Sequence, residues 1–306
     1  MNKKSGIGSG ILICAVLLAG SISACQTHGK KSAGEEAKIN VPKDNMPAVE
    51  ELKKARKIFN ALPSPLESAA IVKSAGSRFD PRLLNQLDNA NSYVTNKSMA
   101  LNLGIYTCDL SFASLYEQTQ LIIDYMNAAK KMADGLGILK AIDQTTIDKL
   151  EENINNSDVI MEIISDTFLN SSSYLEDNGQ HANAAMVLVG GWFEGLYIST
   201  QLVDANHLNN NKLTGRIIDQ KLSVDILLNL LESNKGNKSI DEIKVQVIKL
   251  KAVFDKIKIT TSQIKPEFDN ASKSTLLKSD VKTEMTPEVF KELASTVAEI
   301  RNSFVK

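Results

Sequence analysis

Apolar residues along most of this chain recur every three or four positions, which is the spacing of one face of an α-helix. The last segment shows the pattern most clearly. Thr286 and Pro287 suit the N-cap and the first helical position, and the residues after them form one apolar stripe: Phe290, Leu293, Val297, Ile300 and Phe304. Residues 96–134 and 182–204 are apolar almost all round. They predict two long, central, buried helices.

Other segments agree with a helical body. Residues 243–257 begin with a strand-like alternation, but over the whole segment the helical spacing fits better. Ile218, Leu222, Ile226 and Leu230 form a further stripe. We therefore predict an all-α fold, a multi-helix bundle of about nine or ten helices with no regular series of hairpins.

A short pattern occurs twice. A glycine, an aromatic residue, a leucine and a small residue follow one another at the same spacing from Gly104 and from Gly190. This echo is compatible with duplicated helical units. Helices with the same packing needs would also converge on it, so both interpretations stay open.

The first 26 residues have a different pattern. Lys3 and Lys4 precede an apolar run, 11–19, that is shorter than the about 20 residues needed to span a bilayer. Small residues follow, and the run ends at Cys25. This arrangement resembles the signal peptide and lipobox of bacterial lipoproteins. The resemblance implies cleavage before Cys25, acylation of that residue and attachment to a membrane through its acyl chains.

This resemblance divides the chain into three parts. They are a cleaved signal peptide (1–24), a lipidated Cys25 with a flexible tether to residue 45, and an all-helical globular body (46–306). In enterobacterial lipoproteins an Asp after the cysteine favours the inner membrane, so Gln26 implies a place in the cell envelope at the outer membrane. The side of that membrane that the body faces stays open. The body resembles uncharacterised helical envelope lipoproteins and no characterised family.

Net charge and cysteine content limit the partners that the body can bind and the cross-links that it can form. The whole chain has a formal charge of −1, and loss of Lys3 and Lys4 with the signal makes it −3. A mildly acidic body argues against nucleic acid as a partner. Cys108 is the one thiol left in the body, so no disulfide can form within it. We expect Cys108 to be a small buried apolar residue.

The two all-round apolar segments contain the best candidates for a binding site. Each carries one central carboxylate among aromatic side chains. If the two helices pack together, the carboxylates would share low-dielectric surroundings that raise their pKa values. The candidate pocket residues are Tyr106, Asp109, Tyr116, Trp192, Glu194 and Tyr197. The alternative is that these groups are paired within the core and bind nothing.

Three glycines in the second segment need an explanation. Gly190, Gly191 and Gly195 each cost about 1 kcal/mol relative to alanine inside a helix. A close approach of another helix would offset that cost. Glycine backbone that lines a pocket would be the other reason for them.

Motifs for metal binding and catalysis are absent from the sequence. Asp177 and His181 are four residues apart, but no His-Glu-x-x-His or Glu-x-x-His pair accompanies them. There is no nucleophile elbow and no P-loop. We predict no metal, no cofactor and no catalytic residue.

These observations favour binding over catalysis. We expect a lipid-anchored envelope protein that binds a small apolar or amphipathic ligand or a protein partner. Two alternatives stay open. One is a structural or assembly accessory with no pocket, and the other is an enzyme that uses Asp109 or Glu194 as acid or base.

Overall fold

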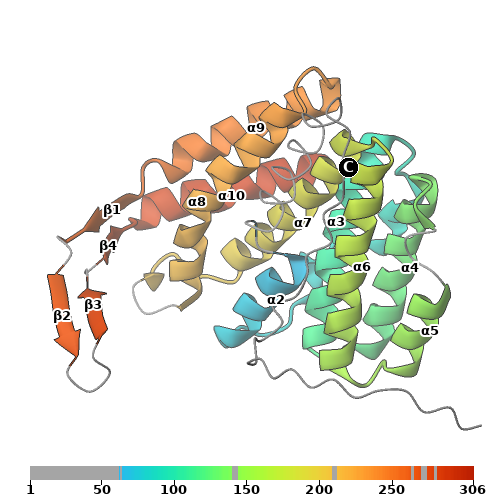
Figure 1. Cartoon of the computed structure of the whole chain (residues 1–306), viewed down its shortest axis with the longest axis horizontal. Helices are drawn as coiled ribbons and strands as arrows, with labels where there is room; N and C mark the ends of the chain where they lie inside the picture. The colour runs from blue at the N-terminus through green and yellow to red at the C-terminus, as the bar shows by residue number, and fades with distance from the viewer. Residues whose placement is uncertain are drawn as a thin grey trace, which may run out of the picture. The chain divides into compact units, whose positions relative to one another are not determined.

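Helices dominate the computed structural model of this chain (Figure 1). It describes residues 62, 64–139, 144–208, 212–262, 265–269, 274–278 and 281–306. All of them belong to one compact unit, 44–306. The predicted signal peptide, Cys25, Gln26, the tether and the boundary at residue 46 lie outside the described residues.

The described helices pack into a bundle, so the all-α multi-helix prediction is confirmed. Two short 3₁₀ helices, η2 (Pro81–Leu83) and η3 (Leu87–Asn91), lie between the first two α-helices that the structure describes. The α-helices are α2 (Pro65–Ser74), α3 (Asn96–Leu115), α4 (Thr119–Gly135), α5 (Gln144–Glu152), α6 (Ser157–Asp177), α7 (His181–Gln201), α8 (Lys212–Ser233), α9 (Lys238–Phe254) and α10 (Pro287–Phe304).

Helices α3 and α7 form the centre of the bundle, and nearly every residue of both is buried. Two glycines let them touch backbone to backbone. A Cβ on Gly104 would lie 2.0 Å from the Val187 carbonyl oxygen, and a Cβ on Gly190 would lie 2.0 Å from the Leu101 carbonyl oxygen. The predicted close approach at Gly190 is therefore confirmed. In each contact a glycine of one helix meets a backbone carbonyl of the other. This similarity is limited to the point where α3 and α7 cross, so duplication of helical units stays a prediction.

The single long helix predicted for 96–134 is wrong. Helix α3 ends at Leu115, and α4 begins at Thr119. Between them Glu117 takes a left-handed backbone, φ 56°, and the Gln118 N–H donates to the Ala113 carbonyl. This is a left-handed helix cap. It turns the chain so that the apolar face of α4 packs along α3 instead of continuing beyond it.

Four short strands lie between α9 and α10, where we expected only helix and loop (Figure 1). Strand β1 (Lys258–Thr261) pairs antiparallel with β4 (Val281–Glu284), and β2 (Lys265–Asp269) pairs antiparallel with β3 (Ser274–Lys278). The β-branched run Ile259-Thr260-Thr261 favours this conformation over helix. An interrupted antiparallel hairpin is thus added to the helical bundle.

Helix α10 closes the chain and packs against α7 and α9. Thr286 is its N-cap and accepts a hydrogen bond from the Val289 N–H, as predicted, and the predicted apolar stripe is buried. The stripe predicted for α8 has one error, because Leu222 is 72% exposed.

Membrane crossing has no support in the described part of the chain, where no helix combines the necessary length and apolar character.

Candidate functional site

Asp109 of α3 and Glu194 of α7 are brought together in the interior, and both residues are fully buried. Arg301 of α10 joins them. Its guanidinium donates two hydrogen bonds to the Glu194 carboxylate, from Nε to Oε2 at 2.7 Å and from Nη2 to Oε1 at 2.7 Å. The fork geometry of Arg suits this two-point contact with a carboxylate. Glu194 and Arg301 therefore form a buried, two-point ion pair.

Asp109 differs from Glu194 in its hydrogen bonds. Its Oδ2 accepts from the Asn85 backbone N–H at 3.0 Å, whereas Oδ1 finds no donor among the described residues. Burial raises the pKa of the Asp109 carboxyl well above its ordinary value, and the charge of Glu194 raises the pKa further. Arg301 opposes this shift. With a proton on Asp109, the three-residue cluster is neutral overall.

A polar network extends from this cluster to the C-terminal end of α10. Asn85 donates to the Tyr93 hydroxyl and to the Asn102 side-chain oxygen. Asn102 donates to the Phe304 carbonyl at 2.8 Å, and the Tyr93 hydroxyl donates to the Val305 carbonyl at 3.1 Å. These bonds tie the end of the chain to α3 and to the 3₁₀ segment.

Two of the predicted tyrosines lie beside the carboxylates. The Arg301 guanidinium carbon lies 4.7 Å from the centre of the Tyr197 ring, a cation–π contact. Tyr106 is buried, and its hydroxyl donates to the Gln86 carbonyl. Burial raises the pKa of Tyr106, and the nearby Asp109 contributes to that shift.

The other two predicted pocket residues lie elsewhere. The Tyr116 hydroxyl donates to the Ser77 carbonyl at 2.6 Å, and its ring packs with Phe79 and Phe112. The Trp192 indole N–H donates to the Gln220 side-chain oxygen at 3.0 Å. The six candidates therefore do not line one pocket.

Arg301 is the member of the cluster that sequence reasoning missed. It lies four residues after Val297 and three before Phe304, so it interrupts the apolar stripe of α10. An arginine at a core-facing position needs a buried anion as its partner. That signal could have connected α10 with the two carboxylates.

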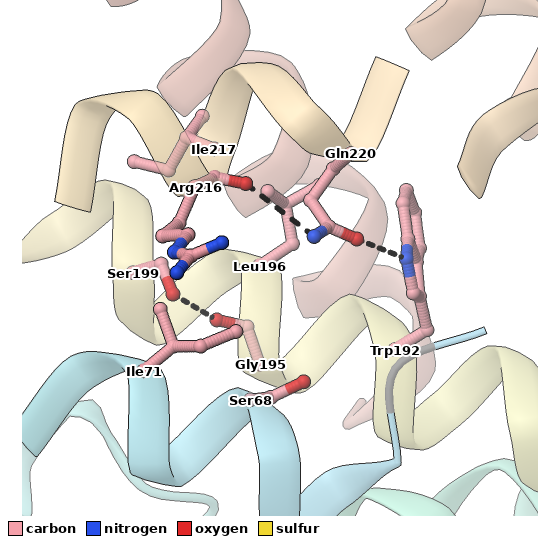
Figure 2. A pocket seen from close by; sticks show the side chains of 9 residues that line it. All are labelled: Ser68, Ile71, Trp192, Gly195, Leu196, Ser199, Arg216, Ile217 and Gln220. Carbon is pink, nitrogen blue, oxygen red and sulfur yellow. Dashed lines mark hydrogen bonds between the residues drawn. The ribbon is translucent and has the colours of Figure 1, made fainter. Parts of the chain in front are cut away.

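A small cavity next to Trp192 lies between α2, α7 and α8 (Figure 2). Its volume is about 20 Å³, enough for about one water molecule. The backbone of Gly195 lines it, and a Cβ at Gly195 would lie 2.5 Å from Ser68 Cβ. Both reasons proposed for the glycines thus occur, close packing at Gly190 and a pocket wall at Gly195.

This cavity adjoins an open groove between α2 and α8. Ile71, Arg216 and Gln220 border both spaces. The groove has a volume of about 760 Å³ and includes the exposed Leu222. Acidic and basic side chains stand on its edges, and it is wide open, so it offers little enclosure to a small molecule.

A more apolar cavity lies among α3, α4, α5 and α6, which are neighbours in the bundle (Figure 1). Its volume is about 50 Å³. Most of its lining is hydrocarbon: Leu103, Leu110, Met126, Ala129, Ile147, Leu150, Ile164 and Phe168. Four polar residues complete it: Thr107, Lys130, Thr167 and Ser171. We refer to this space as the α3–α6 cavity.

Two polar groups of the α3–α6 cavity lack partners among the described residues. Ser171 is 3% exposed, and its hydroxyl has no hydrogen bond. Lys130 is half-buried and forms no ion pair with a described carboxylate. Its neighbour Lys131 instead donates to the Asn91 side-chain oxygen. A ligand in this cavity would meet apolar walls, the buried Ser171 hydroxyl and the Lys130 ammonium group.

None of these three cavities is lined by Asp109 or Glu194. The two carboxylates meet, but in a closed contact with Arg301. General acid–base catalysis needs a reacting atom within hydrogen-bond reach. The acidic cluster is therefore better suited to holding α10 than to chemistry on a substrate.

Histidines in the described part pair with single carboxylates. His181 Nδ1 lies 2.7 Å from Glu176 Oε2, and His207 Nδ1 lies 2.7 Å from Asp204 Oδ2. Among the described residues there is no group of three or more His, Cys, Asp or Glu side chains that could hold a metal ion.

The chain matches no protein-family model, no curated protein and no solved structure.

Proposed function

We propose that this is a lipid-anchored protein of the cell envelope, attached at the outer membrane through acyl chains on Cys25. Its helical body binds the apolar part of a small amphipathic ligand in the α3–α6 cavity. The lipobox resemblance of the N-terminus supports the anchor. The cavity supports the binding role.

One observation carries the binding role: the hydrocarbon lining of the α3–α6 cavity around a hydroxyl with no partner. A buried hydroxyl without a hydrogen bond costs about 1–3 kcal/mol. A ligand that supplies the missing partner would remove this penalty, and its chain would fill the apolar space. Small-molecule sites generally combine apolar walls with a few polar groups in this way.

The size of the cavity limits what can enter without movement. A cavity of about 150 Å³ binds benzene, so about 50 Å³ accepts only the end of a hydrocarbon chain. Helix α5 is the wall best able to yield. It has nine residues, and Ile147 and Leu150 are its contributions to the cavity. A helix of about two and a half turns has little stability of its own, so a longer chain would displace α5 outwards.

Binding of dodecan-1-ol tests this function. The full lipidated chain is kept soluble in an amphipathic polymer, because detergent chains would compete for the cavity. We expect saturable binding of one molecule per chain, measured by native mass spectrometry and calorimetry. Ala129→Val adds two methyl groups inside the cavity and should weaken binding at least tenfold without loss of folding.

Ala252→Val is the matched control. Ala252 is exposed on α9, so the substitution Ala252→Val changes helix propensity as Ala129→Val does, but it does not fill the cavity. Binding should equal that of the unmodified chain. Equal binding by the Ala129 and Ala252 variants, or no binding at all, would refute the cavity as the site. A stoichiometric second protein in place of a ligand would support the accessory role.

A further inference from the structure

The charge distribution of the α3–α6 cavity narrows the chemistry of its ligand. Lys130 is the one charged residue among the described residues that line it, and no Asp or Glu shares the lining. A half-buried charged group beside apolar walls attracts an opposite charge bound next to it more strongly than it would in open water, because water screens the attraction less there. The cavity is therefore electrostatically suited to an acid and unsuited to an amine.

Lys130 is available for such a ligand. No described carboxylate lies within ion-pair distance of its ammonium group. Lys131, the next residue, donates to Asn91 and does not line the cavity. Of these two adjacent lysines, Lys130 lines the cavity and has no partner among the described residues, whereas Lys131 has a partner and lies outside the lining.

Hydroxyl groups complete the polar part of the lining. Thr167 and Ser171 are one turn apart on α6, so they share a helix face. The Ser171 hydroxyl is buried and has no partner among the described residues. A carboxylate accepts hydrogen bonds on both oxygens, from an ammonium group as well as from a hydroxyl. The same head group would satisfy Lys130 and Ser171.

We propose that the α3–α6 cavity binds a single-chain anionic amphiphile, such as a long-chain carboxylic acid, with its acidic head on Lys130 and Ser171 and its chain among the apolar side chains, in the space that opens when α5 is displaced. This inference rests on the proposed function. It adds that the head group of the ligand is negatively charged and that Lys130 and Ser171 bind it.

Three probes of equal chain length separate the inference from the proposed function: dodecanoate, dodecan-1-ol and dodecylammonium. They are titrated below their aggregation limits into the full lipidated chain held in an amphipathic polymer. We expect dodecanoate to bind at least tenfold more tightly than the alcohol, and the ammonium compound to bind most weakly. Lys130→Met, which keeps the length of the side chain, should reduce dodecanoate to the level of the alcohol.

Lys131→Met is the matched control, since it removes the same charge one residue away. It should leave the tenfold preference for dodecanoate intact, and thermal unfolding should show that both variants fold. An unchanged preference in Lys130→Met would overturn the inference while binding of the alcohol still upheld the proposed function. Failure of all three probes to bind would overturn both.

Discussion

Arg301 and Glu194 are 107 residues apart in sequence and form a buried, two-point ion pair at 2.7 Å. Breaking such a pair from one side leaves a charge in the interior without a partner, at a cost of about 3–5 kcal/mol. The pair connects the last helix to the centre of the bundle. It therefore makes the stability of the fold depend on the far end of the chain.

Replacement of Arg301 with methionine should lower the free energy of unfolding by about 3–5 kcal/mol at neutral pH, because Glu194 loses its partner. Urea denaturation of the full chain measures this. The double variant Arg301→Met, Glu194→Gln should lose less than Arg301→Met alone, since no unpaired charge remains. Arg82→Met, at an exposed ion pair with Asp80, is the control and should change little. A double variant that is less stable than Arg301→Met would contradict the assignment.

Asp109 should give the protein an unusual dependence on pH. Its folded pKa lies above the unfolded value, so the folded state holds a proton that the unfolded state releases. That stabilisation is fully present below the unfolded pKa, about 3.9, and is lost as the pH rises through the folded pKa. Asp109→Asn should remove this part of the slope of unfolding free energy against pH, up to about 1.4 kcal/mol per pH unit. If the unmodified protein and Asp109→Asn show the same slope of unfolding free energy against pH, the pKa of Asp109 is not raised in the folded state.

The glycine contact between α3 and α7 should tolerate no side chain. A Cβ on Gly190 would lie 2.0 Å from a backbone oxygen of α3, so Gly190→Ala should force the helices apart and cost several kcal/mol. Gly215→Ala is the counterpart on α8, where nothing lies within 4 Å of the added methyl group. It should stabilise the protein by about 0.5–1 kcal/mol through helix propensity. Thermal and urea unfolding compare the two, and a harmless Gly190→Ala would contradict the close crossing.

Alanine substitutions of Ser171 and Ser172 distinguish an effect on ligand binding from an effect on packing. Ser171 and Ser172 are both buried with hydroxyls that lack partners among the described residues, but only Ser171 lines the α3–α6 cavity. Alanine at either position should leave the free protein equally or more stable, because an unsatisfied hydroxyl is removed. Ser171→Ala should also weaken dodecanoate binding about tenfold, and Ser172→Ala should not. Equal effects on binding would remove Ser171 from the site.

Local signals in the sequence account for much of the fold. The N-cap Thr286 identified the start of α10, and the all-round apolar character of the segments that contain α3 and α7 identified their central place. The glycines of the second segment indicated either a close approach of another helix or a pocket wall, but not which helix would approach. The break at Glu117 coincides with four consecutive polar residues, 117–120. Such a run also fits an exposed turn of a continuous helix, so periodicity alone did not reveal the break, and the left-handed turn depends on packing of α4 against α3. The strands between α9 and α10 were missed because they are short and follow a strong helical period.

The candidate site was harder to predict. Asp109 and Glu194 could be paired from the packing of their helices, but Tyr116 and Trp192 project to other parts of the bundle. The α3–α6 cavity has no sequence signature, because its lining is ordinary core residues from four helices. A cavity results from how side chains from separate segments fail to fill space, and periodicity within one helix does not report that.

Photo-crosslinking with a fatty-acid probe shows directly whether the α3–α6 cavity is the binding site. Dodecanoate with a diazirine at the end of its chain is bound to the full lipidated protein and irradiated, and the labelled residues are mapped by mass spectrometry. We expect label on the walls of the α3–α6 cavity, at Met126, Ile164 or Phe168, and its loss in Ala129→Val. Label in the groove between α2 and α8, around Ile71 and Leu222, that persists in Ala129→Val would contradict the α3–α6 cavity as the binding site.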